Sequence, residues 1–465
     1  MNEKIRKFIS NLPAVSVPEK KIDLRTKLQW TFVIVVLFIV MSFVPLFGVS
    51  KSYSLNFEIL QVLIASHFGS LLSLGIGPIV SASIIIQMLQ GTKIINIDTS
   101  MKEGRVMFQG IQKLSAFAFI ALENGVFVFS GALTPAGPGA FYPVVMFMQL
   151  FLAGIVLLFM DEVVSKWGIG SGISLFILAG ISLQLINTAF NPFITPIGAV
   201  PAIITAFIAG IPLNAVFPIV TVVSTVVLFA VAIWLQSIKV ELPLSFGRLR
   251  GYSIRWPVSL FYTSIIPIVL IVSMLAGVQF FGLTLSHAGI NILGTFTSES
   301  TVFGTQEVAT GGLAAYLSPP TMQQLYTSAV TTGITALEIE SMIIYMVILV
   351  IGAAAFSYVW MYLGGQDPRS VVRQLMESGL SMPGFRRDER VLVDIFKRYI
   401  IPLSILGGAL TGLVAALATF MNTLTAGIGI LLIVMIIYQF YFSLQQDNAD
   451  EFRPIKDKLV GNTME

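Results

Sequence analysis

The stretch SLGIGPIVSASIIIQMLQ, residues 73–90, is apolar enough to lie in a membrane, but it carries two glycines and a proline near its start. Directly before it, IASHFGSLL (residues 64–72) is also mostly apolar and is interrupted by serine, histidine and glycine. A membrane-spanning helix needs roughly 20 mostly apolar residues. Neither piece is long enough alone, whereas the two together are. The sequence therefore predicts one span, residues 57–90, whose backbone is broken at Gly75, Gly77 and Pro78.

The composition of the chain indicates that the bilayer is its solvent. Of the 465 residues, 55% are hydrophobic and 11% are charged, against about 25% charged residues in a typical soluble domain. There is no cysteine, so disulfides and cysteine-based metal sites are excluded, and His67 and His287 are too far apart in the sequence to suggest a ligand pair. Apolar runs recur over residues 30–443 and leave no room for a separate soluble domain.

Ten apolar runs qualify as membrane-spanning helices, so an all-α polytopic membrane protein is expected. The predicted spans are 28–48, 57–90, 108–131, 140–160, 169–188, 213–238, 257–281, 339–363, 400–420 and 425–443. The shorter, proline-flanked piece 199–211 is interpreted as an interfacial or re-entrant segment. Residues 1–27 lack the apolar core of a cleaved signal peptide. They are interpreted as a cytoplasmic amphipathic helix, with a solvated basic tail as the alternative for the first ten residues.

The basic residues fix the orientation of these spans. With ten spans, all but one of the 27 Lys and Arg residues fall on the same side of the membrane, and the exception is Lys51. Because cytoplasmic loops carry the excess of Lys and Arg, both termini are predicted to be cytoplasmic in a multi-pass protein of the cell membrane. The long loop 282–338 has neither Lys nor Arg and is expected to be external.

The ten spans are expected to divide as five plus five. The predicted domains are an N-terminal half at 28–195, an external hinge or linker at 196–212, a C-terminal half at 213–443 and a cytoplasmic tail at 444–465. A repeat with an odd number of spans that occurs twice must be inverted, which gives pseudo-two-fold symmetry about an axis in the membrane plane. This prediction rests on topology, since no persuasive sequence repeat is visible.

The sequence gives catalysis no support. There is no P-loop, HExxH motif, proton-relay series or paired-carboxylate site, so no enzyme activity, metal or cofactor is expected. Glu123, within span three, has no evident basic partner, and both a functional and a structural role stay open for it. Asp161 and Glu162 lie at the cytoplasmic end of span four, just before Lys166, and a structural role is favoured for both.

Glycine clusters and basic loops are the remaining signals. GIGSGI (residues 168–173) opens span five, and Gly427 and Gly429 open span ten. An aliphatic pair at i,i+4 spacing follows the glycines of span two (Ile76 and Val80) and those of span five (Ile173 and Ile177), and by spacing alone both pairs indicate packing or lipid contact. Loops 239–256 and 364–399 are long and basic, and their motifs GRLRGYS and GFRRDER suit a polyanion such as RNA phosphate or acidic lipid.

Several motifs resemble the SecY family, the large subunit of the protein translocon, and they occur in the family's order. They are LGIGPIVSASIIIQML, FQGIQKL, DEVVSKWGIGSGISLFI, KVELPLSFGRLRG, GGQDPRS and PGFRRDERVL. The resemblance covers essentially the whole chain and is strongest to the archaeal and eukaryotic branch. It implies a protein-conducting channel with two pseudo-symmetric halves around a central hourglass pore.

The resemblance also implies roles for single residues. Residues 56–72, which include Ile64, Ser66, His67 and Gly69, match a plug helix that closes the pore from outside, and Gly75, Gly77 and Pro78 match its joint. Six aliphatic positions match the family's constriction ring: Ile76, Val80, Ile173, Ile177, Val269 and Leu432.

A lateral gate between spans two and seven is implied, with Ser81 and Glu123 among its polar groups. The family often has Asn where this chain has Gly277, and Gln279 is a candidate to compensate.

The basic loops match the docking loops of the family, through Arg248, Arg250, Arg386 and Arg387. The implied partners are a SecE-type (gamma) subunit, a small beta subunit, the ribosome or another cytoplasmic translocation partner, nascent chains that bear signal sequences, and the lipid bilayer. Two rival interpretations stay open from the residues: a secondary transporter with broken helices at its substrate site, and a membrane scaffold for ribosomes without a pore.

Overall fold

The structure is a computed structural model. It describes residues 13–20, 22–49, 69–92, 94–95, 97, 102–129, 133, 135–192, 197–246, 253–263, 266–287, 291–301, 304–318, 320, 322–331, 333, 335–377, 380–381, 389–425 and 427–447.

The described residues form long apolar helices, one inside each predicted span or overlapping it. In chain order they are α2 (Leu24–Phe43), α4 (Gly77–Gly91), α5 (Lys102–Phe129), α6 (Phe141–Trp167), α7 (Gly172–Phe190), α9 (Val216–Ser237), α10 (Ile266–His287), α13 (Ala336–Leu363), α15 (Glu389–Phe420) and α16 (Gly427–Asp447). All but α4 and α10 meet a length and hydropathy criterion for crossing a membrane. The predicted fold class, an all-α polytopic membrane protein with ten spans, is therefore confirmed.

The break in span two is where the glycines and Pro78 predict it. The 15-residue helix α4 begins at Gly77, with Pro78 in its first turn, where the missing N–H of proline costs no hydrogen bond. The helix is about 22 Å long, which is shorter than a hydrocarbon core of roughly 30 Å. Residues 71–76, directly before it, form turns rather than helix. The remainder of the predicted plug, residues 56–68, lies outside the described residues.

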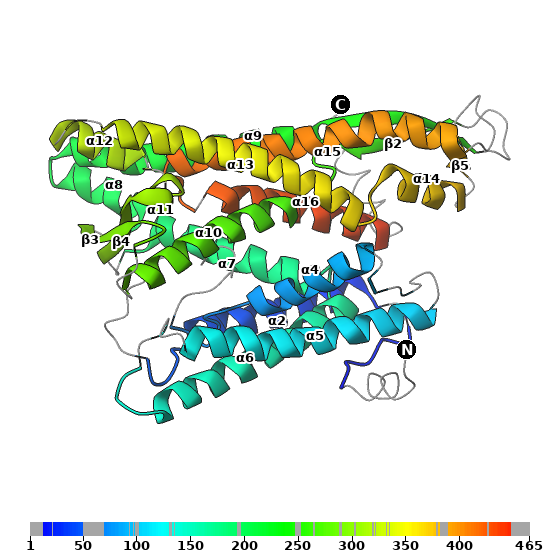
Figure 1. The fold of residues 1–465 in the computed structure, drawn as a ribbon, viewed down its shortest axis with the longest axis horizontal. Helices are drawn as coiled ribbons and strands as arrows, with labels where there is room; N and C mark the ends of the chain where they lie inside the picture. Colours follow the sequence, from blue (N-terminus) through cyan, green and yellow to red (C-terminus); the bar gives the residue numbers. More distant parts are fainter. Residues whose placement is uncertain are drawn as a thin grey trace.

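The long helices form two groups (Figure 1). In the first group α2, α4, α5, α6 and α7 contact one another, and in the second α9, α10, α13, α15 and α16 do so. Each group has its own buried apolar cluster, and α7 contacts α16 at the boundary. Ile177 of α7 and Phe440 of α16 pack against both clusters. The two groups correspond to the two predicted halves, while their inverted symmetry stays a prediction.

Short elements lie at the two ends of the bundle (Figure 1). The Lys- and Arg-rich segments form one end, with β1 (Lys239–Phe246), β2 (Ser253–Ser259), α14 (Pro368–Glu377) and β5 (Leu380–Ser381). The segment without basic residues forms the other, with β3 (Thr295–Thr301), β4 (Gly304–Gly311), α11 (Gly312–Tyr316) and α12 (Met322–Thr331). The predicted interfacial piece is α8 (Ala199–Ile208), about 15 Å long, followed by the 3-10 helix η1 (Pro212–Ala215).

The two basic loops form one packed unit, a contact that the sequence did not predict. Strand β1 pairs antiparallel with β2 and, through Ser245 and Phe246, with β5, so the sheet order is β2-β1-β5. Leu242 and Val258 of this sheet share a buried cluster with α14 and α15. The pairing also corrects the predicted start of span seven at residue 257, because β2 runs through Ser259 and α10 begins only at Ile266.

The helix of span nine extends beyond the predicted membrane-spanning run 400–420. Helix α15 begins at Glu389 rather than at residue 400, and Leu392, Phe396 and Ile400 are all buried. These residues recur every fourth position and form one apolar stripe against the sheet and α14. The intervening charged residues lower the hydropathy of this first part, so a criterion based on hydropathy misses it. The described residues 13–18 have no regular secondary structure, so the amphipathic helix predicted for 1–27 does not extend through them.

Glycines allow α15 to pack closely on α13. A Cβ added at Gly408 would lie 2.7 Å from the Ala353 carbonyl oxygen, and one added at Gly412 would lie 2.5 Å from the Leu349 carbonyl oxygen. Both distances are far below van der Waals contact. The two backbones approach because these positions carry no side chain, as small residues allow in membrane helix pairs.

We expect Gly412→Ala to destabilise the folded chain by about 1–3 kcal/mol, because the added methyl overpacks the α13–α15 contact. The measurement is the apparent Tm of the purified chain in detergent. Gly125→Ala is the matched control, since it also places alanine within a membrane helix, α5, and its Cβ would lie 3.7 Å from Phe147. Equal Tm values for both variants would contradict the close approach.

Candidate functional site

The joint before α4 is a series of turns held by its own side chains and by a neighbouring segment. Gly69 and Gly75 have φ values of 83° and 47°, in the left-handed region that glycine enters without steric cost. The Ser73 hydroxyl accepts from the Gly69 N–H at 3.0 Å and donates to the Ser70 carbonyl at 2.6 Å. The preceding positions Ile64, Ser66 and His67 lie outside the described residues.

Residues 44–46 supply further partners for this joint. The Gly69 carbonyl accepts from Leu46 N–H at 2.8 Å, and Leu71 N–H donates to the Val44 carbonyl at 3.0 Å. Because backbone groups at membrane depth have no water to bond, an interrupted helix needs such partners from the protein. The joint is therefore a hydrogen-bonded structure, with Gly75, Gly77 and Pro78 at the point where helical geometry begins.

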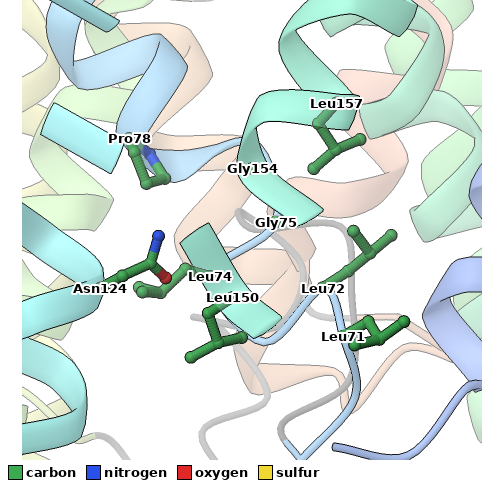
Figure 2. A pocket seen from close by; sticks show the side chains of 9 residues that line it. All are labelled: Leu71, Leu72, Leu74, Gly75, Pro78, Asn124, Leu150, Gly154 and Leu157. Carbon is green, nitrogen blue, oxygen red and sulfur yellow. The ribbon is translucent and has the colours of Figure 1, made fainter. Parts of the chain in front are cut away.

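A small cavity of about 10 Å³ lies behind the joint, between α5 and α6 (Figure 2). Asn124, almost fully buried, donates from Nδ2 to the Ile120 carbonyl at 2.7 Å. Its Oδ1 accepts no hydrogen bond from the described part of the chain. The volume is just enough for one water molecule. The cavity is lined by Leu71, Leu72, Leu74, Gly75, Pro78, Asn124, Leu150, Gly154 and Leu157.

The six residues predicted as a constriction ring belong to the two apolar clusters. Ile76 is 1% exposed and lies in the cluster of the first group, with Val80 and Ile173 packed against it. Leu432 is fully buried in the cluster of the second group, and Val269 packs against it. Ile177 packs against both clusters. All six are thus in or against the apolar cores on the two sides of the α7–α16 boundary, and their arrangement as a ring stays a prediction.

The GIGSGI segment before α7 contacts three other helices. A Cβ added at Gly168 would lie 2.9 Å from Thr31 Oγ1 of α2, and Thr31 Oγ1 also accepts from Ile169 N–H at 3.1 Å. Gly170, at φ 69°, has Phe440 of α16 directly against it. The segment therefore lies where α2, α7 and α16 meet, and its glycines leave the space that the neighbouring side chains occupy.

The third glycine of the segment lies against Asp161 of α6. A Cβ added at Gly172 would lie 2.6 Å from Asp161 Oδ1, and this oxygen accepts from Ile173 N–H at 2.9 Å. In the sequence Asp161 lies beside Glu162 and close to Lys166, and its contact with span five was not predicted. The sequence carries no signal for it, because a serine at the N-cap position, Ser171, predicts that α7 caps itself, whereas Ser171 makes no side-chain capping bond.

Glu162 has the structural role favoured from the sequence. It pairs with Lys113 of α5 at 2.6 Å and with Lys166 at 2.8 Å. The same lysines donate to the carbonyls of Pro13 and Val15, both at 2.5 Å. Together with Trp167 Nε1, which donates to the Ser16 carbonyl at 2.9 Å, they hold residues 13–16 against α5 and the end of α6. All three donors bond backbone carbonyls, so these contacts do not depend on the side chains of this segment.

The predicted gate residues have partners within their own groups of helices. The Ser81 hydroxyl of α4 bonds the Glu123 carboxylate of α5, so Glu123 has a hydroxyl partner that the sequence did not reveal. Gln279 Nε2 of α10 donates to the Leu317 carbonyl at 2.5 Å. A Cβ added at Gly277 would meet no atom within 4 Å. That Gln279 replaces the polar side chain missing at Gly277 stays a prediction. The hydrogen bond that Gln279 makes goes to Leu317, directly after α11.

The two groups approach closely at the end of α4. A Cβ added at Gly91 would lie 2.6 Å from the Leu363 carbonyl oxygen of α13. The four predicted docking residues Arg248, Arg250, Arg386 and Arg387 lie outside the described residues. The strands that precede these arginines in the chain, β1 and β5, are paired, with Phe246 opposite Leu380.

Together these features define a polytopic helical membrane protein of two helix groups, in which the second span, part of the first group, is broken. The SecY family model matches residues 70–441. The chain is 36% identical to "Protein translocase subunit SecY" of Methanothermobacter thermautotrophicus over 99% of each chain. The chain therefore belongs to the SecY family.

Solved structures agree with this membership. One, titled "The plug domain of the SecY protein stablizes the closed state of the translocation channel and maintains a membrane seal", has a TM-score of 0.75 and 32% identity. The second, "Sec61 in the Canine ribosome-channel complex from the endoplasmic reticulum", has a TM-score of 0.75 and 33% identity. Each similarity covers 96% of this chain and 98% of the other.

We expect Gly75→Ala to lower the stability of the joint by about 1–2 kcal/mol, the cost of a left-handed backbone at a residue with a Cβ. The apparent Tm of the purified chain measures the effect. Gly77→Ala is the control, because Gly77 is helical and its added Cβ would lie 3.9 Å from Glu123 Oε2. If Gly75→Ala had a Tm as high as that of Gly77→Ala, the stability of the chain would not depend on the left-handed turn at residue 75.

Proposed function

We propose that this chain is the protein-conducting subunit of a translocon. It lets unfolded polypeptides cross the cell membrane and releases apolar segments sideways into the lipid. One observation carries the proposal: a full-length match to relatives named as protein translocase subunits, in a chain whose second span is broken at Gly75, Gly77 and Pro78. Family members of this type are channel subunits rather than enzymes, so the driving energy comes from a partner.

The proposed constriction is formed by Ile76, Val80, Ile173, Ile177, Val269 and Leu432. Aliphatic side chains offer no hydrogen bonds to a passing chain, so polypeptides of any sequence slide through with little specific binding. A narrow apolar opening also resists wetting, which opposes ion flow when no polypeptide fills it. The proposal is supported by the burial of these residues in or against the clusters that face the α7–α16 boundary.

The proposed plug is residues 56–72, and the turns at 69–76 are its joint. A segment that leaves its seat cannot be part of one continuous rigid helix. Left-handed glycines and serine-closed turns support this assignment, because they give the chain a defined bend without a helical connection. The related SecY structure, described as having a plug domain that maintains a membrane seal, provides further support.

The proposed lateral gate opens along α4, with α10 and α13 on the opposite side. A signal sequence is apolar enough to partition into lipid, and its binding to the open state shifts the population from closed to open. Ser81 and Glu123 would remain paired as α4 and α5 move together, which is supported by their direct hydrogen bond.

We further propose that both termini are cytoplasmic and that Arg248, Arg250, Arg386 and Arg387 dock the ribosome. The relative in a ribosome–channel complex supports a ribosomal partner. The pairing of β1 with β5 supports a shared docking surface, because both arginine-bearing segments continue from neighbouring strands. A SecE-type subunit and a small beta subunit are proposed as membrane partners from family membership.

The decisive experiment is passage of a signal-bearing preprotein into proteoliposomes that contain the purified chain with its small subunits and a cytoplasmic partner. Protease protection of the preprotein inside the vesicles is the expected result. Uptake of a small solute without preprotein passage would point to a transporter instead. Ribosome binding without either flux would point to a scaffold.

Ile173→Asn combined with Ile177→Asn is expected to raise the resting ion conductance several-fold, because polar side chains wet an apolar constriction. The measurement is single-channel recording in planar bilayers without preprotein. The control is Ile186→Asn combined with Ile219→Asn, at exposed positions of α7 and α9. An unchanged resting conductance in the first variant would remove Ile173 and Ile177 from the constriction.

Arg386→Glu combined with Arg387→Glu is expected to weaken ribosome binding, because two phosphate contacts are lost and two repulsions are added. The difference from the unaltered chain should shrink as salt rises, since ions screen exposed charges. Co-sedimentation with ribosomes over a salt series measures it. Arg369→Glu combined with Arg373→Glu makes the same charge change on α14 and is expected to bind more tightly than the first variant. Equal binding by both variants would argue against a specific role for the 386–387 pair.

A further inference from the structure

The first turn of α7 is capped by another helix. The first N–H groups of an α-helix have no acceptor within the helix, and the N-cap residue Ser171 makes no side-chain capping bond. Asp161 of α6 provides the acceptor instead. Its Oδ1 accepts from Ile173 N–H at 2.9 Å, and the carboxylate also accepts from the backbone of Gly172. A carboxylate at a helix N-terminus is further favoured by the helix dipole.

This capping contact depends on the absence of a side chain at residue 172. A Cβ there would lie 2.6 Å from both Oδ1 and Cα of Asp161. Any residue other than glycine would therefore push α6 and α7 apart or turn the carboxylate away. Gly172 is buried, so the added group would have no free space to move into. The pair Asp161 and Gly172 thus sets the distance between the end of α6 and the start of α7.

The turn before α7 is held from two further directions. Thr31 of α2 bonds Ile169 N–H, and Phe440 of α16 lies against Gly170. These contacts hold the turn, whereas Asp161 bonds the helix itself at Ile173. Ile177 follows one turn later on the same face of α7. A change at Asp161 is therefore transmitted directly to both side chains.

We propose that Asp161 is a positioning residue for the pore: it fixes the first turn of α7 and so holds Ile173 and Ile177 at the constriction. The inference rests on the proposed function, in which these two side chains line the closed channel. Without the carboxylate, the start of α7 loses its capping partners and is free to shift or fray. The constriction would then admit water while the rest of the fold persists.

Glu162 provides a matched control in the neighbouring position. Its carboxylate bonds Lys113 and Lys166, so Glu162→Ala removes the neighbouring, less buried acidic group without touching the first turn of α7. Asp161→Asn is the conservative variant. It keeps an acceptor oxygen for Ile173 N–H while it removes the charge, so it should restore most of the capping that Asp161→Ala loses.

The chain has no cysteine, so Ile177→Cys introduces a single thiol whose exposure to water can be measured. The full chain with Ile177→Cys is placed in proteoliposomes, and the rate of modification by a membrane-impermeant thiol reagent is recorded. We expect Asp161→Ala to raise this rate several-fold in the resting channel. Each of these substitutions is made in the Ile177→Cys chain. We expect Asp161→Asn to raise the modification rate much less, and Glu162→Ala to leave the rate equal to that of Ile177→Cys alone.

A second variant keeps the test valid if Asp161→Ala does not fold. Gly172→Ala retains the carboxylate but displaces it, so it should raise the modification rate in the same way. Rates that stay at the resting value in both Asp161→Ala and Gly172→Ala would overturn the positioning role. Equal rates in Asp161→Ala and Glu162→Ala would also overturn it, because the effect would then not come from the contact with α7.

The failure of this inference is distinguishable from failure of the proposed function. A parallel sample carries a preprotein arrested in transit. If modification at Ile177→Cys is the same in resting and engaged channels and in every background, then residue 177 does not line the path and the proposed constriction is wrong. If engagement changes the rate but Asp161→Ala and Gly172→Ala do not, then only the role of Asp161 is wrong.

Discussion

Backbone polar groups in a membrane need hydrogen-bond partners from the protein, and the architecture around residues 69–76 follows from this constraint. The chain leaves helical geometry there, so its donors and acceptors are met by residues 44–46 and by the hydroxyls of Ser70 and Ser73. Helices α5 and α6 lie behind the joint and enclose Asn124 (Figure 2). The first group of helices is therefore built as a support for an interrupted span, which an uninterrupted bundle would not require.

The two groups of helices are joined unevenly. Along α7 and α16 the boundary carries shared apolar contacts through Ile177 and Phe440 and the close approach at Gly170. At α4 the described contacts with the second group go to α13, where Gly91 meets the Leu363 backbone. Regions that share fewer buried contacts separate at a lower free-energy cost. This distribution favours a hinge near α7 and α16 and an opening along α4.

Hydropathy, the distribution of charge, and the positions of glycine and proline were enough to predict ten spans and the break at Gly75–Pro78. Each of these signals depends only on residues that are close in the sequence. The strand pairing between the basic loops was missed, although KVELPLSF (residues 239–246) alternates polar and apolar residues, because its partner Leu380–Ser381 is distant in sequence and only two residues long. The first part of α15, before the predicted span 400–420, was not predicted because its stripe of Leu392, Phe396 and Ile400 is diluted by charge. The contact of Asp161 with Ile173 depends on how two helices meet, which periodicity does not encode.

The polar groups near the proposed gate bear on what opening costs. Ser81 and Glu123 bond each other within the first group, and Gln279 bonds Leu317 within the second. Within the described part of the chain, no hydrogen bond links α4 to α10. Separation of these helices would then exchange apolar helix contacts for lipid contacts, and lipid tails are about as apolar as leucine. A gate of this kind stays closed through close packing, and an apolar segment that inserts between the helices replaces that packing directly.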